Sequence, residues 1–488
     1  MEKRGRYSDY VDGLDASQLR AFHKIIEGDN VFVTGQAGTG KSELIKRVVQ
    51  CWTDEGIKHA ICATTGIAAV AIGGRTFHSI FWMRPGDEDP AVTVDVILKR
   101  IRDAKLHNVY KKQLQGLQAV IIDEVSMMSS PMLQKTSDVL KVVRHSPRPM
   151  GGIQTVLVGD FFQLGPVDRA SFKPLFQSDV YRELVHHSMI LDVMYRQNDE
   201  AFQSLLSRMR LGRLTDEDIA VLRSRVGADV SIDGIAPTIL YSTNRDVDAV
   251  NSEALDALPG DVVVYARYAG HGVVKSSTLV NGNETSAAAL EKFLRDMRDA
   301  EVRLKVGAQV MLTFNFMDLG LVNGSRGVVE DFVDVVDRVG LKGSPGGGSK
   351  GPKGLPESVL DDFDLKKSTE RAVLIRGRRF PRVKFLRPDG SPVSILVPLV
   401  RLERRTDNVL AYAWACPLKL AWATTVHKSQ GQTLDCVQIC LDASVFAEGQ
   451  AYVAVSRARS LRGLSLTAFD PAVVKANPAV VEFYESLS

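Results

Sequence analysis

Short apolar runs alternate with amphipathic segments in the first part of the chain. The runs Val31–Val33, Ile57–Ala63, Ala119–Ile122 and Ile153–Val158 have the length and composition of buried strands. After the first run, apolar residues recur at helical spacing, and charged or polar residues fall between them. These apolar residues are Leu44, Ile45, Val48, Val49 and Trp52. The alternation of strand and helix predicts an α/β protein with a parallel, doubly wound sheet.

A glycine-rich segment, Gly35–Ser42, joins the first predicted strand to the first predicted helix. At such a junction the free backbone N–H groups point at one spot, and glycines let the main chain close around phosphate oxygens. Lys41 is placed to reach the β- and γ-phosphates, and the Ser42 hydroxyl to bind Mg²⁺. The segment therefore predicts a nucleoside triphosphate site. Its members are Gly35, Ala37, Gly38, Thr39, Gly40, Lys41 and Ser42.

Polar residues also follow the predicted strands Ala119–Ile122 and Ile153–Val158. Because the carboxyl ends of parallel strands meet at one edge of a sheet, Asp123 and Glu124 are expected to face the glycine-rich segment. Asp123 can then hold Mg²⁺ through water, and Glu124 can accept a proton from the attacking water. Gln163 can donate to the γ-phosphate and accept from that water. In isolation, the acidic pair would fit solvated carboxylates as well as catalysis, and Gln163 would be read as a surface amide. Their place beside a phosphate loop favours catalysis.

Composition and charge set broad limits. The 488 residues are 45% hydrophobic and 24% charged, which is typical of a globular protein of about three domains or more. A net charge of +3 does not by itself indicate nucleic acid, so any basic groove has to be local. The five cysteines form no C-x-x-C pair and are expected to be reduced core thiols. They are Cys51, Cys62, Cys416, Cys436 and Cys440.

No signal peptide or membrane-spanning segment is recognisable in the sequence. We therefore expect a soluble, intracellular protein without a membrane partner. In a eukaryote its place would be the nucleus, the mitochondrion or both, and otherwise the cytoplasm.

A series of short segments accompanies the glycine-rich loop in a fixed order. They are Thr64–Ala69, Gly73–Ser79, Asp123–Met127, Gly159–Gln163, Met194–Gln197, Arg208–Gly212, Leu304–Met311, Leu321–Ser325, Val426–Thr433 and Gln450–Ala458. The set resembles the Pif-type DNA helicases of superfamily 1B, and the resemblance covers nearly the whole chain from Gln18 onward. It implies ATP and Mg²⁺ as cofactors, single-stranded DNA and DNA forks as partners, and movement in the 5′ to 3′ direction.

The resemblance implies two RecA-like P-loop motor domains with parallel sheets and ATP bound between them. Residues 1–80 and 117–188 would form the first motor domain, and residues 189–261 and 408–488 the second. Residues 81–116 would form a small wedge domain near the fork, although a solvated amphipathic helix would carry the same charges. The basic residues of this insertion are Lys99, Arg100, Arg102, Lys105, Lys111 and Lys112.

Residues 262–407 would interrupt the second motor domain as a larger insertion. Its strand-like runs suggest a small barrel, which the resemblance makes SH3-like. The runs are Val302–Leu312, Gly327–Val336, Ala372–Ile375, Val383–Leu386 and Val393–Leu399. The segment Gly343–Pro352 is too poor in apolar residues to pack and is expected to be a flexible surface loop. DNA contact and a solvated barrel face are equal interpretations of the basic cluster Arg376, Arg378, Arg379, Arg382 and Lys384.

By resemblance, further residues join the nucleotide site. Arg196 and Arg457 would stabilise charge on the γ-phosphate when the cleft between the motor domains closes, with Arg457 as the arginine finger. Gln18 would contact adenine, unless it is a polar residue in a helix capped by Asp15. Gly431 would line the nucleotide site, and Arg459 is expected to be structural. Gly165 replaces the family's usual proline, which puts the stiffness of the Gln163 loop in question.

Two groups of residues would contact single-stranded DNA. Such contacts need hydroxyls and amides for phosphates, with an occasional ring or cation beside the bases. The first motor domain would supply Thr64, Thr65, Thr76, Phe77, His78 and Ser79, and the second Thr424, Thr425, His427 and Lys428. Each histidine taken alone would be read as structural, and only the motif context favours DNA contact.

The favoured function is an ATP-dependent DNA helicase that unwinds duplex or structured DNA, including forks and G-quadruplexes. The family implies roles in DNA repair, replication, recombination and telomere maintenance. A DNA-dependent translocase that remodels protein–DNA complexes without separating strands has the same motor motifs. An inactive nucleotide-gated module is disfavoured because Lys41, Glu124 and both arginines are present. The chain is expected to be monomeric in the absence of DNA.

Overall fold

The computed structural model contains two compact units. Unit 1 comprises Met1–Asn244 and Thr424–Ser488, and unit 2 comprises Arg245–Ala423. Both predicted motor domains lie in unit 1 except for residues 245–261 and 408–423, which belong to unit 2. The structure describes residues 7–65, 68–69, 72–103, 107–166, 173–197, 199–230, 237–275, 278–281, 301–314, 316, 319, 321, 325–334, 372–373, 379–386, 391–406, 409–431, 434 and 436–487.

A six-stranded sheet organises the first half of unit 1, in the order β3-β2-β4-β5-β1-β6. All of its pairs are parallel; Val31 of β1, for example, lies opposite Val156 and His187 on its two neighbours. The strands are β1 (Val31–Gly35), β2 (His59–Ala63), β3 (Arg75–Thr76), β4 (Ala119–Asp123), β5 (Gln154–Val158) and β6 (His187–Leu191). The predicted parallel sheet is confirmed, and it extends to Leu191.

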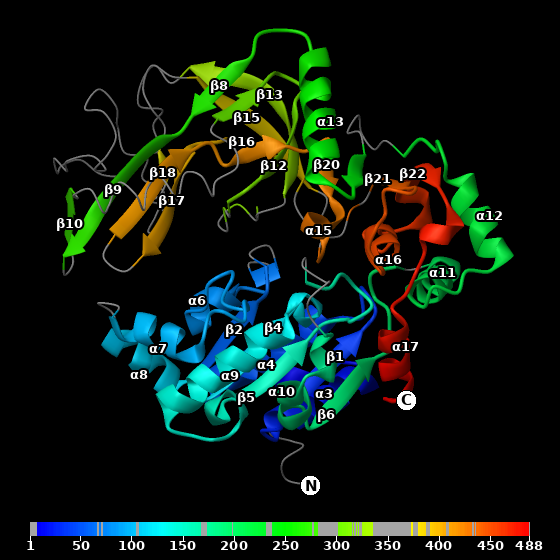
Figure 1. Cartoon of the computed structure of the whole chain (residues 1–488). Helices are drawn as coiled ribbons and strands as arrows, with labels where there is room; N and C mark the ends of the chain where they lie inside the picture. Colours follow the sequence, from blue (N-terminus) through cyan, green and yellow to red (C-terminus); the bar gives the residue numbers. More distant parts are fainter. Residues whose placement is uncertain are drawn as a thin grey trace. The chain divides into compact units, whose positions relative to one another are not determined.

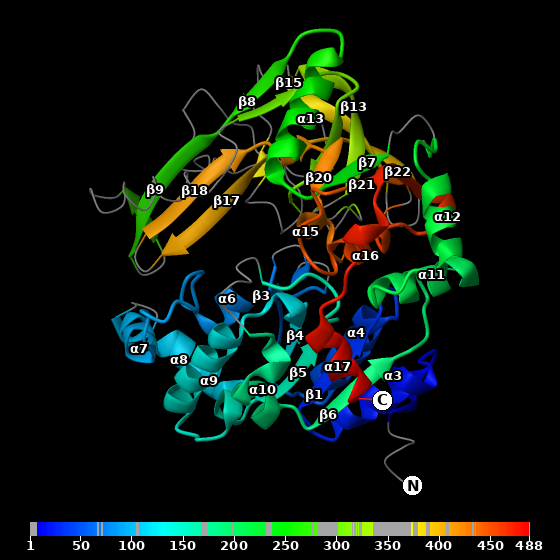
Figure 2. The ribbon, with the colours of Figure 1, turned by 45° about the vertical axis from the view of Figure 1, so that its right-hand side comes forward.

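Helices cover both faces of this sheet (Figures 1 and 2). Alternate residues of each strand explain this, because Val31 and Val33 join one apolar core whereas Phe32 joins another. The first core packs against α2 (Ser8–Val11), α3 (Ala16–Ile26) and α4 (Lys41–Asp54). The second core includes residues of α6 (Phe77–Phe81), α7 (Val94–Asp103), α8 (His107–Gly116), α9 (Ser130–Arg144) and α10 (Asp179–Leu184).

The starts of these helices follow local chemistry. Asp15 caps α3 by accepting hydrogen bonds from the backbone N–H groups of Ser17 and Gln18, and the Gln18 side chain accepts from Asp15 N in return. The predicted cap at Asp15 is therefore confirmed. Ser129 caps α9 in the same way through Met132 N. Helix α4 instead begins after Gly40, whose φ of 77° leads from the loop into the helix.

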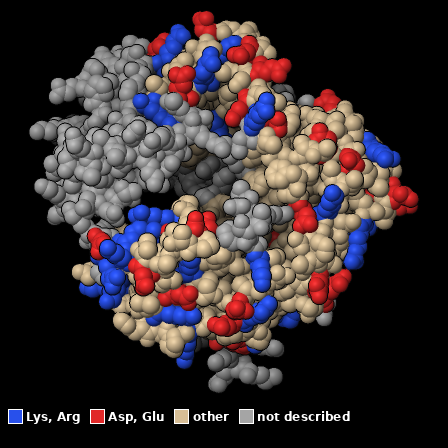
Figure 3. All heavy atoms as spheres, viewed as in Figure 1, with Lys and Arg blue, Asp and Glu red and all other residues tan. Residues whose placement is uncertain are grey.

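The segment 81–116 packs onto the second core of this half. Ile97 and Ile101 of α7 are buried in that core, and Arg100 forms an ion pair with the buried Asp87 at 2.6 Å. The exposed basic residues of the two helices include Lys99, Arg102 and Lys112. Figure 3 shows Lys and Arg side chains gathered over the region that Figure 1 assigns to α7 and α8. The wedge role of this segment stays a prediction.

A second sheet organises the other half of unit 1, in the order β20-β7-β21-β22. Strand β21 is parallel to both of its neighbours. The strands are β7 (Thr238–Tyr241), β20 (Ala423–Thr425), β21 (Val437–Leu441) and β22 (Leu464–Phe469). The helices are α11 (Glu200–Arg210), α12 (Asp216–Ser224), α15 (Val426–Ser429), α16 (Gln450–Val455) and α17 (Pro478–Glu485). Two parallel sheets in one unit agree with the predicted pair of RecA-like halves.

Helix α17 packs on the first half of unit 1. The Phe483 ring stacks on Phe176 with a centroid distance of 4.3 Å and an interplanar angle of 19°. Its neighbour Tyr484 is buried and lies edge-on to Phe483. As a result, the second apolar core runs continuously from β1 and β4 into β21, α16 and α17.

Unit 2 contains antiparallel sheets and helix α13 (Asn244–Ala257). One sheet has the order β10-β9-β18-β17-β14, another β16-β15-β13-β12-β19, and a third pairs β11 with β8. The strands are β8 (Val263–Ala266), β9 (Tyr268–Lys275), β10 (Thr278–Asn281), β11 (Glu301–Leu304), β12 (Gln309–Leu312), β13 (Arg326–Asp334), β14 (Ala372–Val373), β15 (Arg379–Leu386), β16 (Pro392–Leu396), β17 (Leu399–Thr406), β18 (Val409–Ala415) and β19 (Leu418–Leu420). The SH3-like assignment stays a prediction.

One detail of unit 2 differs from the sequence interpretation, and a second bears on the basic cluster. The run Val302–Leu312 is not one strand, because a turn with Gly307 at a φ of 84° separates β11 from β12. Arg379 and Arg382 of the basic cluster pair with Asp334 and Asp331 at 3.2 and 3.5 Å, which offsets their charge. Arg376, Arg378 and the loop Gly343–Pro352 lie outside the described residues.

All five cysteines are free thiols, and burial raises the pKa of Cys62 and Cys416. Among the described residues, no helix is both long and apolar enough to cross a lipid bilayer.

Candidate nucleotide site

The glycine-rich segment forms a tight loop between β1 and α4. Gly38 has a φ of 91°, and a Cβ atom placed on it would lie 2.5 Å from the Cβ of Arg196. Only glycine fits this position, because both the backbone angle and the contact exclude a side chain. The loop therefore lies directly against the segment that carries Arg196.

Lys41 is bound to the loop itself. Its Nζ atom donates to the carbonyl oxygens of Gly35 at 2.7 Å and Gln36 at 2.8 Å. Desolvation lowers the pKa of Lys41, although the nearby carboxylates Asp160, Glu124 and Asp123 oppose this shift. A bound phosphate would replace these two carbonyl oxygens as the acceptor of the ammonium hydrogen bonds.

The loop opens into a cavity of about 830 Å³ within unit 1. Its lining includes most of the predicted nucleotide residues together with residues from the second half of the unit. The lining residues are Ala37, Gly38, Thr39, Gly40, Lys41, Ser42, Asp123, Glu124, Gln163, Tyr195, Arg196, Asp199, Gly431, Arg457, Arg459 and Ser460. The structure therefore brings Lys41, Glu124, Arg196 and Arg457 to one cavity.

Two predicted nucleotide residues lie behind this lining. Gly35 supplies a carbonyl to Lys41, and the Gln18 Nε2 atom lies 3.4 Å from the Gly40 carbonyl oxygen. Gln18 also completes the cap of α3, which is the alternative interpretation of this residue. Its predicted contact with adenine stays a prediction.

Four lining residues, Tyr195, Asp199, Arg459 and Ser460, were not among the predicted site residues. Tyr195 donates from its hydroxyl to Asp15 Oδ2 at 2.8 Å, which places its ring beside the loop. Arg459, expected to be structural, and Ser460 also line the cavity. The signal for Tyr195 was its place next to Arg196 in a recognised segment, whereas Arg459 and Ser460 follow Arg457.

Asp123 and Glu124 end β4 at the cavity. Burial and the Glu124 charge raise the pKa of Asp123 to about 7, while the Glu124 backbone N–H stabilises its carboxylate by donating to Oδ1 at 2.8 Å. Glu124 has a φ of 53°, a left-handed conformation that is uncommon for a residue with a side chain. Contacts on both its backbone and its side chain hold it there.

These contacts come from two distant segments. The Thr64 hydroxyl donates to the Glu124 carbonyl oxygen at 2.9 Å. The Gln430 Nε2 atom donates to Glu124 Oε2, also at 2.9 Å. Glu124 is thus bound to the segment after β2 and to the residue that follows α15.

The two arginines approach the cavity differently. Arg457 follows α16, has 1% of its surface exposed, and donates to Val453 O and Ser456 Oγ at 2.8 Å each. Burial, together with the charge of Arg196, lowers the pKa of Arg457 to about 9. Arg196 is half-buried and donates to the Ser456 carbonyl at 3.4 Å. Two cations therefore line the same cavity as the phosphate loop.

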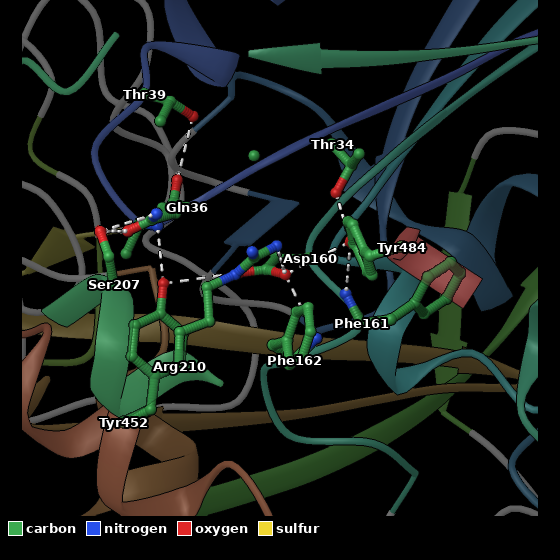
Figure 4. A network of polar contacts seen from close by, with 12 residues as sticks. Thr34, Gln36, Thr39, Asp160, Phe161, Phe162, Ser207, Arg210, Tyr452 and Tyr484 are labelled. Carbon is green, nitrogen blue, oxygen red and sulfur yellow. Dashed lines mark hydrogen bonds and ion pairs between the residues drawn. The ribbon is translucent and has the colours of Figure 1, made fainter. Parts of the chain in front are cut away.

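A buried polar network lies beside the cavity, with Asp160 at its centre (Figure 4). Arg210 donates from Nε and Nη2 to the two Asp160 oxygens at 3.1 and 2.8 Å, and its guanidinium lies 4.2 Å from the Phe162 ring centroid. The hydroxyls of Tyr452 and Tyr484 lie 3.4 and 3.3 Å from Asp160. The carboxylate is completely buried, so these donors replace water.

The same network reaches the phosphate loop. The Ala37 backbone N–H donates to the Tyr452 hydroxyl at 3.0 Å, and Gln36 exchanges hydrogen bonds with Ser207. Tyr484 also forms a short hydrogen bond with Thr34 of β1 (Figure 4). Helices α11, α16 and α17 are thereby tied to the strand and loop that form the phosphate site.

The predicted DNA residues of the first half have varied environments. Thr64 binds Glu124, Thr65 accepts a hydrogen bond from Ala68 N, and the Ser79 hydroxyl donates to the Thr76 carbonyl. Burial lowers the pKa of His78. Phe77 is completely buried and packs on Phe81 at 4.9 Å between ring centroids. The predicted contact of Phe77 with a base is thus not supported, because its ring belongs to the core.

The predicted DNA residues of the second half lie at β20 and α15. Thr424 and Thr425 are buried in β20 with 4% exposure each, which leaves little of their surface for a ligand. His427 is partly exposed on α15. The side chain of Lys428 lies outside the described part of the chain.

Two parallel sheets in unit 1, a phosphate loop after strand β1 of one, and arginines from the other half that line the same cavity define a P-loop nucleotide-binding protein with RecA-like halves. Residues 13–219 match the family described as PIF1-like helicase, and residues 297–332 match the 2B domain of the DNA helicase Pif1. The crystal structure of the Candida albicans Pif1 helicase is 33% identical, with a TM-score of 0.78 over 97% of this chain and 99% of that one. The chain belongs to the Pif1-like helicase family.

Other relatives agree with this assignment. The ATP-dependent DNA helicase PIF1 of Danio rerio is 36% identical over 477 residues, which cover 97% of this chain. The chain spans 64% of the length of that relative. A Bacteroides Pif1 helicase, crystallised with ADP-AlF3 and single-stranded DNA, shares the fold at 24% identity, with a TM-score of 0.65 over 97% of both chains.

Proposed function

We propose that this chain is an ATP-dependent DNA helicase that moves 5′ to 3′ on single-stranded DNA. One observation carries the proposal: Lys41, Glu124, Arg196 and Arg457, which come from four separate segments, line a single cavity. The name of the Danio rerio relative, an ATP-dependent DNA helicase, supports the same activity. The polarity of movement follows from the sequence resemblance.

The residues of the cavity suggest how hydrolysis proceeds. Lys41 leaves the loop carbonyls and binds the β- and γ-phosphates, and Glu124 accepts a proton from the water that attacks the γ-phosphorus. Gln163 contacts that water and a γ-phosphate oxygen. Arg196 and Arg457 stabilise the negative charge that develops on the transferred group. Loss of the γ-phosphate weakens the attraction between the phosphate loop and these arginines, which lets the two halves separate.

Magnesium fits the oxygen donors of the cavity. Ser42 and Asp123 both line it, and hydroxyl and carboxylate oxygens are ligands that Mg²⁺ prefers. Among the described residues, no group of three or more His, Cys, Asp or Glu side chains forms a metal cage. This agrees with an ion that takes most of its ligands from phosphates and water. The ion would neutralise charge on the β- and γ-phosphate oxygens.

We further propose that the chain unwinds forks and structured DNA such as G-quadruplexes in genome maintenance inside the cell. The role would extend to repair, replication, recombination and telomere maintenance. The exposed basic residues of α7 and α8 support a contact with the DNA backbone in this region. The protein would be monomeric before it binds DNA.

A strand-displacement assay tests the proposed function. We expect the chain to separate a duplex with a 5′ single-stranded tail in an ATP-dependent manner, and to leave the same duplex with a 3′ tail intact. Equal activity on both substrates would contradict the proposed polarity. Hydrolysis stimulated by DNA without strand separation would instead support a translocase.

Lys41→Ala tests the assignment of the phosphate loop. It should abolish ATP hydrolysis, because it removes the ammonium group that binds the β- and γ-phosphates, while single-stranded DNA binding is retained. Phosphate release and fluorescence anisotropy measure the two properties. Retained hydrolysis would show that the phosphate loop has been misassigned.

A further inference from the structure

The Glu124 carboxylate is bound by an amide that no part of the proposed hydrolysis requires. Gln430 donates from Nε2 to Glu124 Oε2 at 2.9 Å, and only 5% of the Gln430 surface is exposed. The two residues are 306 positions apart in the sequence. The contact therefore depends on how the two halves of unit 1 pack, rather than on local chain geometry.

Gln430 directly follows α15, the helix that carries His427 and Lys428. Its backbone N–H donates to the His427 carbonyl oxygen at 3.4 Å, so the residue continues the turn of this helix. Gly431, with a φ of 81°, comes next and lines the nucleotide cavity. A displacement of α15 would consequently move the Gln430 amide relative to Glu124.

The Gln430 amide is fixed at one end only. Among the described residues, its buried Oε1 atom has no hydrogen-bond partner, while Nε2 is engaged by Glu124. An amide can form hydrogen bonds through both of these atoms. Because one contact holds it, little has to be broken for the side chain to leave the carboxylate.

The other side of Glu124 meets the first predicted DNA segment. The Thr64 hydroxyl donates to the Glu124 carbonyl oxygen at 2.9 Å, and the Thr64 backbone N–H donates to Asp123 O at 3.3 Å. The general base thus lies between the two segments that are proposed to bind DNA. One of them reaches its main chain, and the other its carboxylate.

We propose that Gln430 is a positioning residue that restrains the Glu124 carboxylate until DNA binds at α15; this rests on the proposed function. Without DNA, the amide engages Oε2, one of the two carboxylate oxygens, and restrains the carboxylate. DNA bound at His427 and Lys428 displaces α15 and draws the amide away, which frees Glu124 to accept the proton. The DNA dependence of hydrolysis then passes through this single contact.

Substitution of Gln430 tests the proposal. Gln430→Leu keeps most of the side-chain volume and removes the donor, and Gln430→Asn keeps the amide but shortens its reach. For both variants we expect kcat without DNA to rise roughly tenfold, the order expected for loss of a hydrogen bond to a charged group. The kcat with saturating oligothymidylate and the Kd for that oligonucleotide should stay within about twofold of the unsubstituted chain.

Gln438→Leu is the matched control. Gln438 lies in β21 and its amide contacts Ser465 at 3.4 Å, away from Glu124. This variant should keep the same ratio of DNA-stimulated to basal kcat as the unsubstituted chain. Thermal unfolding of all three variants shows whether each is folded, and Gln430→Asn decides the test if Gln430→Leu is not.

A binding measurement adds a readout that does not depend on turnover. By linkage, DNA and a mimic of the hydrolysis state should enhance each other's binding. ADP with aluminium fluoride should bind DNA-free Gln430→Leu about as tightly as it binds the unsubstituted chain with DNA. A basal kcat like that of the unsubstituted chain, or a parallel fall of both rates, would overturn the proposal.

The proposed function can fail separately. If the unsubstituted chain hydrolyses no ATP with or without DNA, the proposed function is refuted, and the restraint on Glu124 with it. If that chain is stimulated by DNA and the variants keep the same stimulation, only the restraint by Gln430 is refuted.

Discussion

At the scale of single residues, the cavity combines cations and carboxylates that are largely withdrawn from water. Arg457 is almost fully buried, yet its fixed side chain lines the same cavity as Lys41. Backbone and hydroxyl acceptors hold two of its donor groups. A guanidinium held in this way can act on developing charge without reorganising, which is the condition for strong electrostatic catalysis.

Removal of this cation should affect the rate far more than binding. We expect Arg457→Ala to lower kcat by roughly a thousandfold or more, with nucleotide affinity changed much less, because an arginine finger acts mainly in the transition state. Single-turnover hydrolysis and binding of a fluorescent ATP analogue measure the two effects. Arg457→Lys keeps a charge without the planar fork and should recover only part of the rate. A loss of binding alone would contradict the finger role.

At the scale of elements, the end of β5 and the end of α11 are joined by a buried ion pair. Asp160 follows β5, Arg210 ends α11, and the tyrosines of α16 and α17 complete the carboxylate's donors. Burial of such a pair does not by itself favour folding, but loss of one member leaves the other charge unpaired. The elements around the phosphate loop are therefore sensitive to this single carboxylate.

We expect Asp160→Asn to lower the free energy of unfolding by about 3 kcal/mol, because Arg210 would remain buried without its counter-charge. The exposed pair between Arg213 and Glu485, at 3.4 Å, provides the control. Glu485→Gln should cost at most about 1 kcal/mol, since exposed pairs contribute little. Urea unfolding followed by circular dichroism measures both variants. Equal losses of unfolding free energy in the two variants would show that the buried pair contributes no more to stability than the exposed pair.

Particular residues show what the sequence could and could not predict. Lys41, Ser42, Asp123 and Glu124 were found because each follows a strand within a few residues, so local pattern determines their place. The contact of Asp160 with Arg210 and that of Gln430 with Glu124 join residues 50 and 306 positions apart. Such pairs depend on how whole elements pack, which periodicity does not reveal.

Phe77 shows that a motif and a periodicity can point to different roles. Its place in a recognised segment suggested a contact with DNA, but it packs in the core together with Ile80 and Phe81 of the same helix. The spacing of these three residues, i, i+3 and i+4, is that of a buried helical face. The burial of Phe77 thus agrees with this spacing, and its contact with DNA stays a prediction.

At the scale of the whole molecule, the two compact units differ in their sheets, and one of them holds the cavity. Unit 1 holds the cavity, both parallel sheets and every predicted nucleotide residue, and unit 2 holds the antiparallel sheets. Within unit 1, α17 adds aromatic contacts to the first half through Phe483, which lies near Phe32, Phe161, Phe176 and Tyr181. These contacts attach α17 to the first half of unit 1.

Truncation of this ring should weaken unit 1. We expect Phe483→Ala to lower the free energy of unfolding by about 2 kcal/mol, somewhat less than for a fully buried phenylalanine because Phe483 is half-buried. Phe446, which is 70% exposed, is the matched control, and Phe446→Ala should leave stability almost unchanged. Thermal unfolding monitored by tryptophan fluorescence distinguishes them. Similar unfolding midpoints for both variants would show that the Phe483 contacts of α17 do not stabilise unit 1.

The depth at which Arg457 lies has a consequence for the evolution and the heat sensitivity of this motor. Its guanidinium is dehydrated when the polypeptide folds, so none of that cost falls on nucleotide binding, and its field acts on phosphate through a medium of low polarity. The burial of Arg457 thereby strengthens its effect on the reaction and lowers the conformational stability of the protein. Substitutions that merely loosen α16 should let water reach this cation and slow turnover at temperatures well below those that unfold the protein.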